Sequence, residues 1–184
     1  KKNGEDTICY AFSYYYAELA CARMLVELNQ TMLPEGELLP AQEEAILKRV
    51  DQIQQQEGLM LDELQRKAVL ESVRNSILIL TGGPGTGKTT TINTIIRYFE
   101  GEGLDLYLAA PTGRAAKRMT EATGYEARTI HRMLELSGAM PESGKKASFE
   151  RNEDNPLEAD VIIVDEMSMV DIHLFQSLLK AVSP

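Results

Sequence analysis

Residues 82–89, which read Gly-Gly-Pro-Gly-Thr-Gly-Lys-Thr, constrain the fold of this chain more than any other feature. They match the phosphate-binding pattern GxxxxGK[ST] in full, and they stand between a short aliphatic run and a helical pattern. Glycines let successive backbone N–H groups turn toward phosphate oxygens, and the helix that follows adds the positive end of its dipole. We expect Lys88 to contact the β- and γ-phosphates of a nucleotide and Thr89 to coordinate Mg²⁺. The alternative is a flexible glycine loop without a ligand.

A second aliphatic run, residues 161–164, ends in the acidic pair Asp165 and Glu166. In parallel α/β sheets the carboxyl end of a strand beside the phosphate-binding strand faces the phosphates. We expect Asp165 to hold Mg²⁺ through water and Glu166 to orient and deprotonate an attacking water, which favours a hydrolase over a nucleotide switch. The alternative is that the two acids cap the helix that begins near Asp171.

The rest of the pattern predicts strands that alternate with helices, and therefore an α/β fold with a parallel sheet flanked by helices. A loop is expected at 34–40 and a loop or a weak hairpin at 137–160, and Asp62 is the predicted N-cap of the third helix. Strands are expected at 77–80, 104–110 and 161–164. Helices are expected at 8–29, 41–56, 61–73, 88–100, 113–122, 129–136 and 171–182.

Composition excludes several classes of protein. The longest aliphatic runs have four residues, whereas a membrane span needs about 20. Cys9 and Cys21 form neither a disulfide framework nor a zinc site, so we expect reduced thiols in a cytoplasmic protein. The net charge is −9, yet residues 112–132 carry five bases against two acids. Such a patch points to a polyanion, with a solvated helix face as the alternative. Its bases are Arg114, Lys117, Arg118, Arg128 and Arg132.

Four segments, in the order GGPGTGKTTT, APTGRAAKRM, TIHRML and NPLEADVIIVDEMSMVD, resemble the first motor domain of superfamily 1 DNA helicases. The resemblance is to the RecD-like branch, related to the exodeoxyribonuclease V alpha subunit, and it spans residues 59–184. Residues 10–28 resemble the segment before the motor in the stand-alone members. The resemblance to RecD-like helicases implies a RecA-like P-loop fold. It also implies a motor that uses ATP and Mg²⁺ to move 5′ to 3′ on single-stranded DNA, in repair or recombination. The chain then divides into a helical segment, 1–57, and a partial first motor domain, 58–184.

The resemblance also implies roles for single residues. Gln65 matches the glutamine that reads the adenine edge, with an exposed helix glutamine as the alternative. Thr112, Gly113 and Arg114 match a motif that lies against the DNA backbone. Thr129 and His131 match a second such motif, with a core histidine as the alternative for His131, while His173 matches no role. Lys88, Asp165 and Glu166 would be catalytic. The nucleotide contacts would be Gly82, Gly83, Pro84, Gly85, Thr86, Gly87, Lys88, Thr89 and Thr90.

The first methionine is Met24, and the family continues with another strand and a second motor domain that supplies an arginine finger. We therefore expect a piece of a longer protein, with negligible hydrolysis by these residues alone. Its expected partners are single-stranded DNA, the second motor domain and repair or recombination proteins. The family's next strand lies between 77–80 and 161–164, so we expect a gap there or a direct pairing across it.

Two alternative functions remain open. One is the helicase part of a conjugative relaxase, which the absence of histidine from residues 1–57 disfavours. The other is an ATP-binding scaffold subunit that does not hydrolyse, which the intact phosphate-binding and acidic motifs disfavour.

Overall fold

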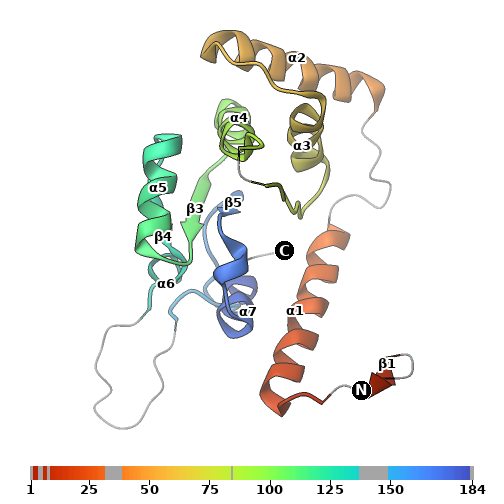
Figure 1. Ribbon diagram of the computed structural model, residues 1–184, viewed down its shortest axis with the longest axis vertical. Coiled ribbons are helices and arrows are strands. Elements are labelled where there is room, and N and C mark those ends of the chain that lie inside the picture. Colours follow the sequence, from red (N-terminus) through yellow and green to blue (C-terminus); the bar gives the residue numbers. More distant parts are fainter. Residues whose placement is uncertain are drawn as a thin grey trace.

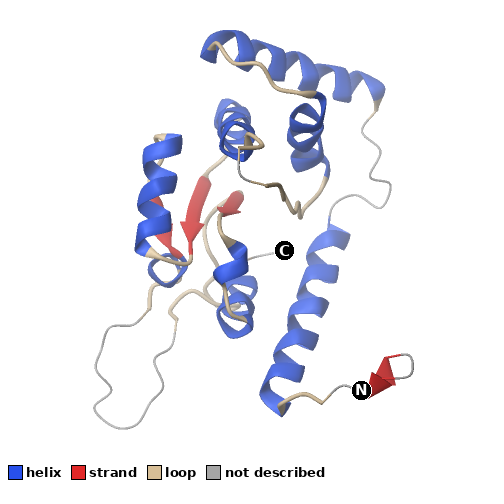
Figure 2. Cartoon of the chain, viewed as in Figure 1, coloured by secondary structure: helices blue, strands red, loops and turns tan. Residues whose placement is uncertain are grey.

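A small parallel sheet forms the centre of the chain. The computed structural model describes residues 2–3, 6–7, 9–31, 39–83, 85–136 and 149–182. Its central strands are β3 (Leu106–Ala110), β4 (Ala127–Thr129) and β5 (Val161–Val164), in the order β4-β3-β5 (Figure 2). Leu108 of β3 is in register with Ala127 on one side and Ile163 on the other. The predicted α/β fold with a parallel sheet and flanking helices is confirmed.

Helices cover both faces of this sheet, because successive side chains of a strand point to opposite faces. On one face, Leu108 packs with Ile96 and Met119 from two of the helices. On the other face, the neighbouring Ala109 packs with residues that include Leu178. The helices of the first face are α4 (Lys88–Gly101) and α5 (Gly113–Thr123), and those of the second are α6 (Ile130–Met133) and α7 (Ile172–Ala181).

Two further helices, α2 (Pro40–Glu57) and α3 (Glu63–Arg74), pack beside α4, as Figure 1 shows. Val50 of α2, Val69 of α3 and Phe99 of α4 belong to one buried cluster. The predicted N-cap is confirmed, because the Asp62 carboxylate accepts a hydrogen bond from the backbone N–H of Gln65 at 2.9 Å. This cap fixes where α3 begins, and hence where its first turn lies relative to the glycine loop.

The first long helix, α1 (Phe12–Thr31), packs against α7 near the other end of the described chain. Ala17 and Cys21 are buried in this contact, and the Cys21 thiol donates to the carbonyl oxygen of Ile172 at 3.9 Å. The rings of Tyr14 and His173 lie 5.1 Å apart between centroids. His173, for which the sequence offered no role, therefore takes part in the docking of α1. Residues before α1 form two short antiparallel strands, β1 (Lys2–Asn3) and β2 (Asp6–Thr7).

The predicted strand at 77–80 is wrong. These residues are described but form no strand, and Ile79 is 85% exposed. A strand needs a neighbouring ladder of N–H and C=O groups, and within the described residues β5 pairs with β3 alone. Either a gap or a direct pairing was expected between 77–80 and β5. The structure has the gap.

Other differences are smaller. The strand β4 was not predicted, because Ala-Arg-Thr offers no aliphatic run. The helix expected at 129–136 shortens to Ile130–Met133, since Thr129 is its N-cap and Glu135 has a φ of 53°. Residues 32–38 and 137–148 of the expected loops lie outside the described residues. Phe149 forms an antiparallel bridge with Leu136, and 150–160 are irregular apart from an Asn152–Asn155 bridge. Within the described part of the chain, no helix is long and apolar enough to cross a membrane.

Candidate active site

The glycine loop before α4 forms a closely packed cradle. Gly85 and Gly87 both have a φ of 74°, in the left-handed region that glycine favours. A Cβ at Gly87 would lie 2.1 Å from Nε2 of Gln65, so a side chain has no room there. Gly82 and Gly83 are exposed at the mouth of the loop, and Pro84 lies outside the described residues. Backbone atoms therefore line this turn, as a phosphate site requires.

Lys88, the first residue of α4, is turned back over the loop. Its Nζ donates to the carbonyl oxygens of Gly82 and Gly83 at 2.6 and 2.9 Å. The hydroxyl of Thr86 also donates to the Gly83 carbonyl, at 2.9 Å. A phosphate oxygen in the cradle is a stronger acceptor than either carbonyl, since it carries charge. The ammonium group thus stands where an anion would take over its hydrogen bonds.

The acidic pair lies at the end of β5, and its backbone is fixed by two hydrogen bonds. The N–H of Asp165 donates to the carbonyl oxygen of Ala109 at 3.0 Å. The N–H of Glu166 donates to the Asp165 carboxylate at 2.8 Å. Glu166 has a φ of 55°, which is uncommon for a residue with a side chain. The pair does not cap α7, because the carboxylate of Asp171 accepts from the first N–H groups of that helix.

One pocket joins the acidic pair to the start of α4. It has a volume of about 210 Å³, and Thr89, Asp165 and Glu166 all line it. A threonine hydroxyl and carboxylates are the oxygen ligands that Mg²⁺ prefers. The glycine cradle, Lys88 and this oxygen set are therefore chemically suited to a nucleotide with Mg²⁺. Thr90, also in the first turn of α4, is half-buried, and its carbonyl accepts from the Thr94 hydroxyl at 3.0 Å.

Arg118, one of the cations of the basic patch, also lines this pocket. Its Nη2 donates to Oε1 of Glu166 at 2.5 Å. The two residues are 48 positions apart, so no local spacing in the sequence indicates the contact. A long-range ion pair of this kind becomes visible only when α5 and the end of β5 are placed in space.

Gln65 lies on α3 against the glycine loop. Its Nε2 donates to the carbonyl oxygens of Thr86 and Gly87 at 3.3 and 3.5 Å. Its Oε1 accepts from the N–H of Asp62 at 2.9 Å, which completes a reciprocal cap at the start of α3. Gln65 is thus attached to the phosphate-binding loop, rather than being an exposed helix glutamine.

The residues predicted to contact DNA lie where two strands end. Thr112 follows β3 and N-caps α5, and Thr129 ends β4 and N-caps α6. Ala110 and Thr129 are in register, so both caps lie at the same edge of the sheet. Each hydroxyl accepts one backbone N–H at 3.2 Å and keeps its own hydrogen for another acceptor.

The other predicted DNA contacts are exposed. Gly113 and Arg114 are exposed at the start of α5, and His131 is exposed on α6 with its ring 5.8 Å from that of Phe149. The alternative of a core histidine is therefore wrong. Exposure leaves these groups accessible to an external ligand.

Ion pairs reduce the free charge of the basic patch. Lys117 pairs with Glu121 at 3.8 Å, and Arg118 pairs with Glu166. Arg128 pairs with Glu126 at 3.1 Å, and hydrogen bonding from this guanidinium lowers the pKa of the Glu126 carboxyl. Within the described residues, no ion pair involves the two remaining cations of the patch, Arg114 and Arg132.

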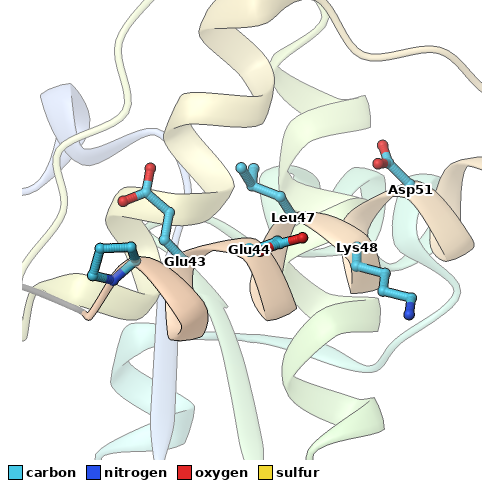
Figure 3. A pocket seen from close by; sticks show the side chains of 6 residues that line it. Glu43, Glu44, Leu47, Lys48 and Asp51 are labelled. Carbon is cyan, nitrogen blue, oxygen red and sulfur yellow. The ribbon is translucent and has the colours of Figure 1, made fainter.

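A larger hollow, of about 710 Å³, lies along α2 (Figure 3). Among the described residues a single helix lines it, with three acids, one lysine, one leucine and a proline, and none of those described in the glycine loop or the acidic pair takes part. Its lining residues are Pro40, Glu43, Glu44, Leu47, Lys48 and Asp51. The predicted metal-binding residues and the acidic pair therefore lie at the smaller pocket.

Comparison with known proteins supports the resemblance. A family model described as an AAA domain matches residues 65–184. The chain is 42% identical over 124 residues to the ATP-dependent RecD2 DNA helicase of Deinococcus radiodurans, which covers 67% of this chain and 16% of that protein. It is 37% identical over 145 residues to the RecBCD enzyme subunit RecD of Mycolicibacterium smegmatis, covering 66% of this chain and 25% of that subunit. It is 34% identical over 139 residues to the RecBCD enzyme subunit RecD of Haemophilus influenzae, covering 65% of this chain and 22% of that subunit.

The chain thus spans between about a sixth and a quarter of the length of these relatives. The match to the family model begins at Gln65 of this chain, and it includes the glycine loop, the basic patch and the acidic pair. The similarity to the motor part of RecD-like helicases, first indicated by short motifs, is confirmed.

Proposed function

This chain belongs to the AAA-domain family, and we propose that it is the ATP-binding motor part of a RecD-like DNA helicase. The observation that carries the proposal is the pocket that Thr89, Asp165 and Glu166 share beside the Lys88 cradle. A hydrolase needs phosphate binding, metal ligands and a base within reach of one another. We assign residues 58–184 to the motor and residues 1–57 to the helical segment before it.

The proposed reaction divides among residues of this chain. Backbone N–H groups of residues 82–83 and 85–90 bind the phosphates, and Lys88 neutralises the β- and γ-phosphate charge. Bound ATP with Mg²⁺ supplies the phosphoryl group and a cation that offsets its charge. Thr89 would hold that cation and Asp165 would hold it through water, while Glu166 orients the attacking water and takes its proton. The Gln65 amide, which bonds the carbonyls of Thr86 and Gly87 and the N–H of Asp62 in this structure, would exchange these partners for the edge of adenine, which suits a group that donates and accepts together.

The edge that carries Thr112 and Thr129 is the proposed path of single-stranded DNA. The hydroxyls and N–H groups of the two caps suit phosphate oxygens, and Arg114 adds an exposed charge. His131 and Gly113 complete the contact surface. We propose movement in the 5′-to-3′ direction in repair or recombination, with an arginine finger from a second motor domain and with repair or recombination proteins as further partners.

The proposal is tested with two substitutions in the natural protein that contains this chain. Lys88→Ala should weaken Mg·ADP binding by about 1.5–3 kcal/mol, because a charge-assisted hydrogen bond is lost. Glu166→Gln should bind Mg·ADP as the wild type does and lose DNA-stimulated turnover. Lys48→Ala, an exposed cation of α2, is the control for loss of charge.

Calorimetry measures the affinity and phosphate release measures turnover. Equal affinity of the wild type and Lys88→Ala would refute nucleotide binding at the cradle. Full turnover by Glu166→Gln would refute its role as the base. Duplexes with either a 5′ or a 3′ single-stranded tail then report the direction of movement.

A further inference from the structure

We infer that Arg118 is a positioning residue that restrains Glu166 until DNA reaches α5, and this inference rests on the proposed function. The restraint is the ion pair between Arg118 and Glu166, which joins the helix that begins at the proposed DNA edge to the proposed catalytic base. It would make hydrolysis slow in the absence of DNA.

The geometry places the pair at the rim of the proposed reaction pocket, with the Arg118 side chain largely exposed. Nη2 of Arg118 and Oε1 of Glu166 are 2.5 Å apart, and both residues line the pocket that contains Thr89 and Asp165. The backbone of Glu166 is already held by its N–H bond to the Asp165 carboxylate. The position of the Glu166 carboxylate therefore depends on what its side chain contacts, and in the described part of the chain its one ion-pair partner is Arg118.

This contact opposes the chemistry that Glu166 is proposed to perform. A general base must lie within hydrogen-bond reach of the water and have an oxygen available for its proton. Oε1 of Glu166 is engaged by a guanidinium, and the carboxylate is directed toward α5. Hydrolysis is fastest when the pair opens, or when Arg118 finds another acceptor.

DNA supplies such an acceptor. Arg118 follows Arg114 by four residues on α5, and residues with this spacing lie on the same face of a helix. The N-terminus of α5, with Thr112 and Gly113, is the proposed DNA edge. A backbone phosphate that approaches Arg114 competes with Glu166 for the Arg118 guanidinium.

Arg118 differs from the other paired cations of the patch in where its partner lies. Lys117 pairs with an acid of its own helix, and Arg128 pairs with an acid two residues away. The partner of Arg118 is on another element, 48 residues along the chain. Release of Lys117 or Arg128 would therefore leave Glu166 unaffected, whereas release of Arg118 would free it.

The test measures ATP turnover of the natural protein without DNA and with saturating single-stranded DNA. Arg118→Ala should raise kcat without DNA about two- to fivefold, because a change of this size matches the strength of a partly exposed ion pair. KM for ATP should stay unchanged, and the stimulation by DNA should fall by the same factor. Arg118→Lys keeps the charge and should retain the low rate, while Lys180→Ala, which breaks an ion pair of α7, is the control.

Three results would overturn the inference. An unchanged rate without DNA in Arg118→Ala would show that the pair restrains nothing. Loss of turnover both with and without DNA, at unchanged Mg·ADP affinity, would instead assign Arg118 to the transition state. A wild-type rate equal to that of Lys88→Ala, with DNA present, would refute the proposed function itself and the role of Arg118 with it.

Discussion

Replacing Gly87 with alanine tests whether Gln65 and the glycine loop are packed as one unit. Alanine in the left-handed region costs about 1–2 kcal/mol, partly offset by the reduced entropy of the unfolded chain. The added Cβ would also lie 2.1 Å from Nε2 of Gln65, and so expel the amide from the carbonyls of Thr86 and Gly87. Two long hydrogen bonds contribute about 1–2 kcal/mol together. The whole substitution should therefore cost about 2–3 kcal/mol.

Gly85 provides a matched control. Its φ is also 74°, but a Cβ added there meets nothing within 4 Å. Gly85→Ala therefore carries the backbone cost alone, about 1 kcal/mol. The difference between the two variants isolates the displacement of Gln65.

Urea unfolding in the absence of nucleotide, monitored by far-UV circular dichroism, gives the free energy of unfolding of each variant. In a Gln65→Ala background the amide is absent, so Gly87→Ala should then cost no more than Gly85→Ala. Equal costs of the two glycine substitutions in the wild-type background would refute the reasoning. So would a Gly87→Ala cost that does not change when Gln65 is removed.

Two further predictions concern DNA and the thiols. Arg114→Ala in the natural protein should reduce the slope of log K against log salt for single-stranded DNA by about 0.7, the value of one phosphate contact; an unchanged slope in titrations at several salt concentrations would place the DNA elsewhere. Cys9 is exposed, whereas Cys21 is buried and its burial raises the pKa of the thiol. Iodoacetamide at mildly alkaline pH should therefore alkylate Cys9 first, as peptide mass analysis would reveal, and equal rates would contradict the packing of α1 on α7.

Elements set by local patterns could be predicted from the sequence. The strand at 161–164 agrees with β5, because an uninterrupted aliphatic run bounded by polar residues is a local signal. The N-cap at Asp62 could also be predicted, because an aspartate directly before a helical pattern is a local signal. The run at 77–80 carries the same signal and forms no strand, because strand pairing depends on a neighbour that no local pattern supplies.

In the candidate site, too, local motifs could be predicted and contacts between distant residues could not. Thr89 and Asp165 were predicted from motifs, and the structure brings them to one pocket. Arg118 could not be predicted, since its contact with Glu166 spans 48 residues and arises from the packing of α5 near the end of β5. The hydroxyls of Thr112 and Thr129 also proved to be helix caps, a local role compatible with the proposed one.

The docking of α1 on α7 has a consequence for synthesis on the ribosome. Cys21 and its partner Ile172 are 151 residues apart, and a ribosome adds about 5–20 residues per second. After α1 is made, roughly 8–30 s pass before α7 exists to receive it. A single helix without a packing partner is marginal in water, and Phe12 of α1 is 79% exposed even after docking. The nascent chain must therefore carry this aromatic segment without its partner helix α7 for that interval.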